Sequence, residues 1–294
     1  MLRILTALFA LSILCQIPAS AQTVKTMQIE TARTESFTMD CLRFGNGKKP
    51  LVIIPGLSVQ SVMKFSGAVA ESYKLLADDF TVYLFERRNE LSSSYSVYDM
   101  SRDTAEAIRA LKLGGVYLFG VSQGGMIAMK IASDYPGLVR SLILGSTSAH
   151  VTRTQFSVID EWIQFAKAGN AEGLYLSFGE KLYPESVFEQ SRKLLIDSAK
   201  TVTPEELTRF VILAEATKDF DAVDDLKKIA CPVLVIGSKD DKVLGGEASV
   251  KIFESLKDKP GCELFMYDGY DHAAYDTAPD YRERMLKFFV SHSE

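Results

Sequence analysis

Short runs of β-branched and aromatic residues alternate with longer amphipathic segments along most of the chain. This alternation is typical of a mostly parallel sheet whose strands are joined by helices. Near-continuous apolar runs such as Val233-Leu234-Val235-Ile236 indicate strands that are covered on both faces. We predict strands at 51–54, 81–85, 116–119, 141–144, 232–236 and 263–267, with helices at about 62–76, 98–111, 125–134 and 281–290.

The segment before the first of these strands has a different pattern. Apolar residues at Phe37, Met39 and Cys41 alternate with polar ones up to Arg43 and Phe44, and Gly45-Asn46-Gly47 follows. A period of two residues is that of a strand with one buried face. We therefore predict that an antiparallel hairpin opens the fold.

The alternation of strands and helices stops between residues 150 and 226. This stretch has no convincing strand, and Thr203-Pro204-Glu205-Glu206 has the N-cap threonine, first-turn proline and capping-box glutamate of a helix start. Pro184-Glu185 resembles a second start. Because ligands of parallel sheets bind at the carboxyl ends of the strands, we interpret 150–226 as a helical lid over that edge. The core would then comprise 22–149 and 227–294. The alternative is a structural subdomain that never touches the ligand.

Residues 1–21 have the order of a secretory signal peptide. Arg3 precedes an apolar stretch, and Ala19-Ser20-Ala21 supplies small residues before a cut at Gln22. A membrane anchor is less favoured, because the apolar run is shorter than the roughly 20 residues that span a bilayer. Acylation of Cys15 is disfavoured by the bulky Leu14 before it. We expect an exported protein, periplasmic or secreted, without a stable membrane anchor.

Composition excludes several classes of function. Removing the leader and its single charged residue from the 294-residue chain of net charge −5 leaves 273 residues with a charge of −6. An acidic chain without a basic run is not expected to bind nucleic acid. Sequence motifs for nucleotides or metals are absent, so we expect no cofactor. Cys231 and Cys262 precede consecutive predicted strands, which leaves a disulfide between them open.

The clearest chemical motif is Gly120-Val121-Ser122-Gln123-Gly124, a G-x-S-x-G sequence. A predicted strand leads into it and a helix of small residues leads out of it. Such a strand–serine–helix turn is a nucleophile elbow, which exposes the serine at the top of a sheet. The alternative is a structural glycine-rich turn. We predict that Ser122 is a nucleophile.

A serine hydroxyl needs a base, normally a histidine that is oriented by a carboxylate. Of the three histidines, His292 lies at the C-terminus and His150 begins the predicted lid. His272 follows the strand at 263–267 and is the candidate base by elimination and position. The acid is expected after the strand at 232–236, where Asp240 and Asp241 are both candidates.

Two backbone donors are expected to stabilise an oxyanion. The first is the N–H of Gln123, directly after the nucleophile. The second is the N–H of Leu57, in the loop Pro55-Gly56-Leu57-Ser58 that follows the first predicted parallel strand. Backbone donors do not depend on the identity of the side chain.

The chain resembles the α/β-hydrolase superfamily, in its lidded branch of esterases, lactonases and proline iminopeptidase-like enzymes. The resemblance covers nearly the whole chain after residue 21 and rests on the elbow, on Gly269-Tyr270-Asp271-His272 and on the spacing Gly237-x-x-Asp240. It implies an α/β-hydrolase fold, a mostly parallel sheet flanked by helices with a helical lid insertion. The same spacing implies that Asp240 is the acid.

Two segments depart from the pattern of the superfamily. Pro55-Gly56 stands where a His-Gly pair is usual, and Glu86-Arg87-Arg88-Asn89 stands where many members have an aspartate and a glycine-rich turn. The first departure affects the prediction of the substrate pocket more than the prediction of the reaction class. We interpret Glu86 as a structural ion-pair partner.

These features together predict an exported serine hydrolase that cleaves a small carboxylic ester or lactone through Ser122, Asp240 and His272. A second hypothesis is an aminopeptidase of the iminopeptidase type, which would need an acidic lid residue to hold the substrate amine. A third is a binding protein that keeps the fold without turnover. Oligomeric state and acyl-chain length cannot be read from the sequence.

Overall fold

A computed structural model describes residues 27–293, so the predicted leader, its cleavage site and Cys15 lie outside the described residues. Its centre is an eight-stranded sheet of order β1-β2-β4-β3-β5-β6-β7-β8. The pairs β1–β2 and β2–β4 are antiparallel, and all the others are parallel. The strands are β1 (Met27–Arg33), β2 (Thr38–Phe44), β3 (Lys49–Ile54), β4 (Phe80–Phe85), β5 (Val116–Val121), β6 (Val139–Gly145), β7 (Val233–Ser238) and β8 (Cys262–Tyr267).

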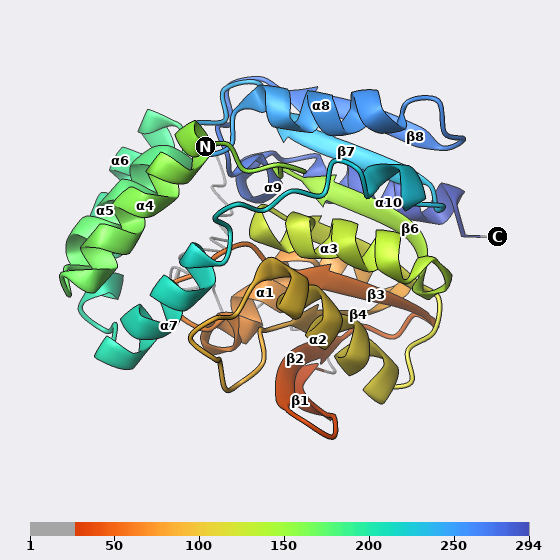
Figure 1. The fold of residues 1–294 in the computed structure, drawn as a ribbon, viewed down its shortest axis with the longest axis horizontal. Coiled ribbons are helices and arrows are strands. Elements are labelled where there is room, and N and C mark those ends of the chain that lie inside the picture. The colour runs from red at the N-terminus through yellow and green to blue at the C-terminus, as the bar shows by residue number, and fades with distance from the viewer. Residues whose placement is uncertain (1–26, 294) are drawn as a thin grey trace, which may run out of the picture.

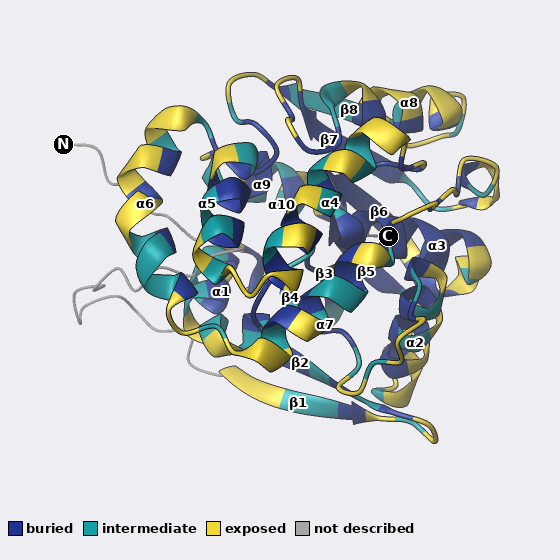
Figure 2. Cartoon of the chain, turned by 60° about the vertical axis from the view of Figure 1, so that its left-hand side comes forward, coloured by how far each residue is buried: buried dark blue, intermediate teal, exposed yellow. Residues whose placement is uncertain are grey.

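The antiparallel hairpin at the start of the fold is formed by β1 and β2. Its turn lies at 34–37, where the N–H of Thr34 donates to the carbonyl of Phe37. The segment Gly45-Asn46-Gly47 is therefore not the turn of this hairpin. It connects β2 to β3, which lies on the far side of β4. The outer strand β1 is exposed over much of its length (Figure 2).

Helices cover both faces of the sheet (Figure 1). On one face α3 packs on β5 and β6, and α8 packs on β7 and β8. On the other face, Phe289 of α10 makes edge-on ring contacts with Phe80 of β4 and Tyr117 of β5. The helices of the core are α1 (Ser66–Ser72), α2 (Val97–Ala110), α3 (Gln123–Asp134), α8 (Gly246–Leu256), α9 (Ala274–Thr277) and α10 (Tyr281–Ser291).

The helix predicted over 62–76 is divided into three pieces. A 3₁₀ turn at Val62–Phe65 precedes α1, and another at Lys74–Leu76 follows it. The break falls at Tyr73, whose backbone leaves helical geometry at φ −104° and ψ 12°. This buries the Tyr73 ring in the core, with its centroid 6.5 Å from that of Phe119. Tertiary packing thus overrides local helical periodicity here.

Four helices lie between β6 and β7, and we call them the cap helices. They gather beyond the carboxyl ends of the parallel strands, at the left of Figure 1. Within 151–226, all of which is described, there is no strand. Thr203 caps the last of these helices with a complete capping box, as the sequence predicted. The cap helices are α4 (Arg153–Lys167), α5 (Ala171–Leu182), α6 (Glu185–Ala199) and α7 (Pro204–Glu215).

Aromatic side chains hold the cap helices together. The rings of Trp162 on α4 and Phe178 on α5 lie 4.1 Å apart, and Phe178 makes an edge-on contact with Phe210 on α7. All three side chains are buried, whereas the outer faces of these helices are exposed (Figure 2). No helix within 27–293 is long and apolar enough to cross a membrane. The three described cysteines, Cys41, Cys231 and Cys262, are free thiols.

Candidate active site

Ser122 lies at the sharp turn between β5 and α3. Its backbone has φ 54° and ψ −123°, a conformation that costs free energy for any residue other than glycine. The turn is held by the sheet, because the N–H of Ser122 donates to the carbonyl of Gly145 at the end of β6. Gly124 permits the close approach of α3 to β3, since a Cβ there would lie 2.1 Å from the carbonyl oxygen of Ile54. This is the geometry of a nucleophile elbow, as predicted.

His272 and Asp241 form a buried pair. The two side chains are 2% and 3% exposed, and the distance from His272 Nδ1 to Asp241 Oδ2 is 2.8 Å. The other carboxylate oxygen of Asp241 accepts the N–H groups of Val243 at 2.8 Å and Leu244 at 2.9 Å. Burial alone would raise the pKa of Asp241, but the charge and hydrogen bond of His272 and the two backbone donors hold it below its ordinary value.

The expectation that Asp240 orients the histidine is wrong. Asp240 is exposed, and its Oδ2 accepts the N–H of Gly269 at 2.6 Å in the loop before His272. The chain turns immediately after β7, where the N–H of Asp241 donates to the carbonyl of Ser238. Consecutive side chains on such a turn point in different directions, so only Asp241 reaches the imidazole. The spacing within the sequence located the segment but chose the wrong one of two neighbours.

The loop after β3 adjoins Ser122, as the oxyanion prediction requires. A Cβ at Gly56 would lie 3.2 Å from Ser122 Cβ, which shows how closely this loop approaches the serine. Leu57 follows in the same loop and lines the same cavity as Ser122. Gln123 is the first residue of α3 and has a buried side chain. Gln123 therefore follows Ser122 directly in the chain, and Leu57 lies at the cavity that Ser122 lines.

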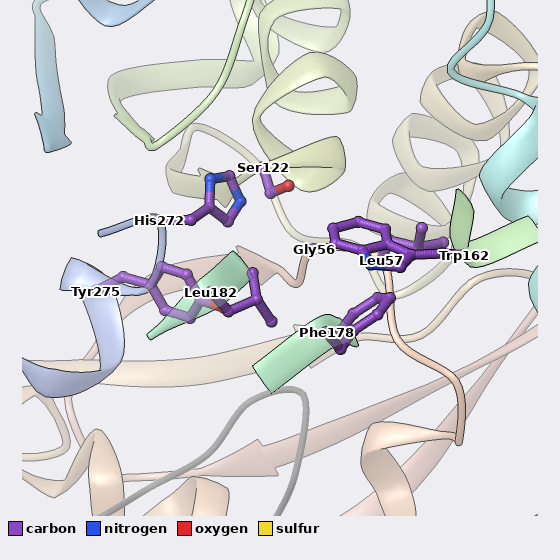
Figure 3. A pocket seen from close by; sticks show the side chains of 8 residues that line it. All are labelled: Gly56, Leu57, Ser122, Trp162, Phe178, Leu182, His272 and Tyr275. Carbon is purple, nitrogen blue, oxygen red and sulfur yellow. The ribbon is translucent and has the colours of Figure 1, made fainter. Parts of the chain in front are cut away.

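These groups surround a small, mainly apolar cavity between the sheet and the cap helices (Figure 3). The view shows Ser122 and His272 side by side. The Ser122 hydroxyl points toward the Trp162 side of the cavity, so a rotation about its Cα–Cβ bond is needed to meet the imidazole. Catalytic hydrogen bonds are often loose in free enzymes. The lining residues are Gly56, Leu57, Ser122, Trp162, Phe178, Leu182, His272 and Tyr275.

The cap helices are attached to the histidine loop. The N–H of Ala273, directly after His272, donates to the carbonyl of Leu182 at the end of α5. The hydroxyl of Tyr183 donates to Asp276 on α9 at 2.9 Å. Because Leu182 also lines the cavity, this attachment sets the position of one cavity wall relative to the histidine.

Other residues that the sequence singled out lie away from the cavity. His150 pairs with Asp221 at the surface, and His292 bonds to the last helical turn. Glu86, interpreted as an ion-pair partner, instead accepts the backbone N–H groups of Val62 and Arg87. Within 27–293, no group of three or more histidine, cysteine, aspartate or glutamate side chains is arranged to hold a metal ion.

Sequence reasoning missed Arg87, which is 2% exposed and follows β4. Its guanidinium donates to the carbonyl of Pro55 at 2.8 Å and to the side-chain oxygen of Gln123 at 3.1 Å. The unusual Glu86-Arg87-Arg88-Asn89 segment was the only signal for it, and arginines are usually exposed.

The elbow, the buried histidine–aspartate pair and the adjoining loop appear together in one known family. A family model described as the alpha/beta hydrolase fold matches residues 49–279. The chain belongs to this family. It is an α/β hydrolase with an eight-stranded, mostly parallel sheet.

The relatives of this α/β hydrolase are distant. It is 26% identical over 224 residues to a protein of Agrobacterium fabrum named "Putative carbamate hydrolase RutD", covering 73% of this chain and 85% of the relative. An alpha/beta hydrolase enzyme from a Medee basin deep-sea metagenome library has a similar structure, with a TM-score of 0.78 at 19% identity, covering 89% and 97% of the two chains. The enol-lactonase from Burkholderia xenovorans gives a TM-score of 0.75 at 15% identity, covering 89% and 100%. The two structural matches show the shared fold.

Proposed function

We propose that this α/β hydrolase is a serine hydrolase that cleaves a short-chain carboxylic ester or lactone through an acyl-enzyme. The observation that carries the proposal is that Ser122, on its strained elbow, lines the same cavity as His272, which is itself bonded to the buried Asp241. A nucleophile, a base and an orienting carboxylate are the three groups that acyl transfer by serine requires.

In the proposed mechanism Ser122 Oγ attacks the carbonyl carbon, and His272 Nε2 takes the hydroxyl proton. Asp241 accepts the Nδ1–H of His272 and stabilises the imidazolium that forms. The N–H groups of Leu57 and Gln123 donate to the oxyanion of the tetrahedral intermediate. His272 then returns the proton to the leaving alkoxide, and water attacks the acyl-enzyme by the same path.

The cavity supports a small, uncharged acyl group. The space that it encloses is far smaller than the roughly 300–1,000 Å³ of sites that hold drug-sized ligands. Apart from Ser122, His272 and the Tyr275 ring, its lining is glycine and apolar side chains. An ionised substrate group would have no partner there, and burying an unpaired charge costs on the order of several kcal/mol.

The same lining favours an ester or lactone over the substrate of an aminopeptidase. A substrate amine would need a carboxylate at the cavity, and none of the described residues that line it carries one. Glu161, Glu172 and Glu180, which are acidic residues on the cap helices, are exposed. The names of the relatives, a carbamate hydrolase and an enol-lactonase, add carbamates to the acyl compounds worth testing.

Export is also part of the proposal. It rests on the order of charged, apolar and small residues in 1–21 and predicts a chain that begins at Gln22. N-terminal sequencing of protein recovered from the periplasm or medium tests it. Recovery of a chain that begins at Met1, or of a lipid on Cys15, would contradict the proposal.

The catalytic proposal is tested by labelling with a fluorophosphonate, which reacts with activated serines. The wild-type chain should be labelled and Ser122→Ala should not. Ser133→Ala removes another hydroxyl, on α3 and bonded to the carbonyl of Lys130, and serves as the matched control that keeps labelling. Unchanged labelling of folded Ser122→Ala would refute the assignment, and no labelling of the wild type would favour a binding protein.

A panel of substrates then identifies the class. Nitrophenyl acetate, butyrate and octanoate test acyl length, and a γ-lactone, an aryl carbamate and a prolyl nitroanilide test the other acyl groups. We expect turnover to be greatest for acetate or butyrate and lowest for the prolyl amide. Preference for the amide would replace the esterase proposal with the aminopeptidase hypothesis.

A further inference from the structure

Arg87 is a buried cation beside the candidate site that the proposed mechanism does not use. Its side chain reaches from the end of β4 toward the loop after β3 and the start of α3. Within 27–293 no carboxylate forms an ion pair with its guanidinium, and its Nε is buried without a hydrogen-bond partner. Burial lowers the pKa of Arg87 to about 10, with opposition from the charge of Glu86, so the side chain stays cationic at neutral pH.

Burying an arginine without a direct ion pair is unfavourable, and the nearby charge of Glu86 offsets only part of that cost. The partners it does have are two neutral oxygens, the carbonyl of Pro55 and the side-chain amide of Gln123. Both belong to the segments that carry the proposed oxyanion donors. Pro55 lies two residues before Leu57, and Gln123 is itself the second donor residue.

The hydrogen bond from Arg87 to the carbonyl of Pro55 fixes the peptide plane between Pro55 and Gly56, which directly precedes Leu57. Gly56 provides no side chain to hold this loop, and the histidine usual before it in the superfamily is replaced by proline. The guanidinium is therefore the group that restrains the loop from the side of β4.

Gln123 is restrained at both ends of its side chain. Its Oε1 accepts from Arg87 at 3.1 Å, and its Nε2 donates to the carbonyl of Leu213 on α7 at 2.6 Å. The same cap helix holds the Arg87 segment, because Arg209 donates to the carbonyls of Arg87 and Arg88 at 3.2 and 2.9 Å. Arg87 is thus the point at which the oxyanion loop, the elbow and a cap helix are joined.

We propose that Arg87 is a positioning residue for the oxyanion site: one guanidinium aligns the N–H groups of Leu57 and Gln123 by holding Pro55 and the Gln123 amide. This inference rests on the proposed serine hydrolase function. It predicts a contribution to the transition state rather than to substrate binding, because an oxyanion exists only after Ser122 has attacked.

The test compares Arg87→Met and Arg87→Lys with Arg88→Met. Methionine keeps much of the length of the side chain and removes every donor, and lysine keeps the charge with less directional donation. Arg88 is the neighbouring arginine, bonded to Asp103 and to the carbonyl of Glu90 rather than to the oxyanion loop, so it is the matched control.

For each variant, kcat and KM are measured on the best ester of the panel. The values are normalised to the number of active sites, which is titrated by fluorophosphonate labelling to completion. The affinity for a trifluoromethyl ketone is measured in parallel, because the serine adds to its carbonyl to give a tetrahedral adduct that carries an oxyanion. Loss of one oxyanion donor typically costs about 10²–10³-fold in kcat.

We expect Arg87→Met to lower kcat per titrated site on the order of 10²-fold, with KM within threefold and with a parallel loss of ketone affinity. Arg87→Lys should lie between this variant and the wild type, and Arg88→Met should match the wild type. A merely structural role would lower the number of titrated sites and leave kcat per site unchanged, and that result would overturn the proposal.

If Arg87→Met does not fold, Gln123→Met provides the second test. It removes the amide that receives the guanidinium and keeps the backbone donor, so it should also lower kcat per site without raising KM. Unchanged kcat in Gln123→Met and Arg87→Lys would overturn the proposal. A wild-type chain that is not labelled would overturn the proposed function and this inference together, whereas normal labelling with normal Arg87→Met turnover overturns only the inference.

Discussion

Replacing Asp241 with asparagine should lower turnover about 10⁴-fold, whereas the same change at Asp240 should have little effect. The structure dictates how the new amide would sit. Oδ1 of Asp241 accepts two backbone N–H groups, from Val243 and Leu244, so the oxygen of an asparagine would take that place. Its NH₂ group would then face His272 Nδ1, which would have to be an acceptor. The imidazole proton would move to Nε2, where it prevents the ring from accepting a proton from Ser122.

The magnitude follows from the cost of avoiding this arrangement. Turning the amide around would leave two buried N–H groups unpaired, at about 1–3 kcal/mol each. The productive tautomer of His272 is therefore disfavoured by about 2–6 kcal/mol. At 1.36 kcal/mol for each tenfold change in rate, this lowers turnover by a factor of roughly 30 to 10⁴. We expect the upper end, because the variant also loses the negative charge that stabilises the imidazolium. Asp240→Asn keeps an oxygen for the N–H of Gly269 and should stay within about threefold, since that side chain is exposed.

The assay is kcat on one ester at pH 7 for both variants, with Ser122→Ala as the baseline and circular dichroism as the check of folding. The pair is matched because the two residues are adjacent and the substitution is the same. A larger loss in Asp240→Asn, or more than a tenth of wild-type turnover in folded Asp241→Asn, would refute the assignment of Asp241.

Three further outcomes are expected. Gly124→Ala should destabilise the fold by about 3 kcal/mol, because its Cβ would overlap the carbonyl of Ile54, whereas Gly137→Ala meets no atom within 4 Å and should be neutral; urea denaturation of both variants checks this. The pKa of Asp241 in the folded protein lies below its ordinary value of 3.8. The ionised carboxylate therefore stabilises the fold fully above pH 3.8, and this stabilisation is lost as the pH falls through the pKa of the folded state. The gap in unfolding free energy between wild type and Asp241→Asn should therefore be smaller at pH 3 than at pH 7. Denatured, non-reduced protein lacking residues 1–21 should titrate three thiols, and a count of one would contradict the free state of Cys41, Cys231 and Cys262.

The sequence alone was sufficient for the fold class and for naming most residues of the candidate site. Buried parallel strands are continuous apolar runs, so β3, β5 and β7 could be located without any structure. The elbow was readable because a strand, a glycine-flanked serine and a helix are neighbours in the chain. His272 followed by elimination among three histidines. Each of these inferences depends on residues that are close in sequence or few in number.

The tertiary structure decided the features that depend on where side chains point rather than on the order of residues in the chain. Asp240 and Asp241 are adjacent and have the same side chain, and the spacing favoured the wrong one. Only the turn after β7 determines which carboxylate meets the imidazole. Nothing local distinguishes Arg87 from a surface arginine either. Its role arises because β4 lies beside β3, which brings an arginine from one strand end to the carbonyl of Pro55 at the next. Contacts between residues far apart in sequence are set by packing and side-chain direction, and a one-dimensional pattern carries no record of either.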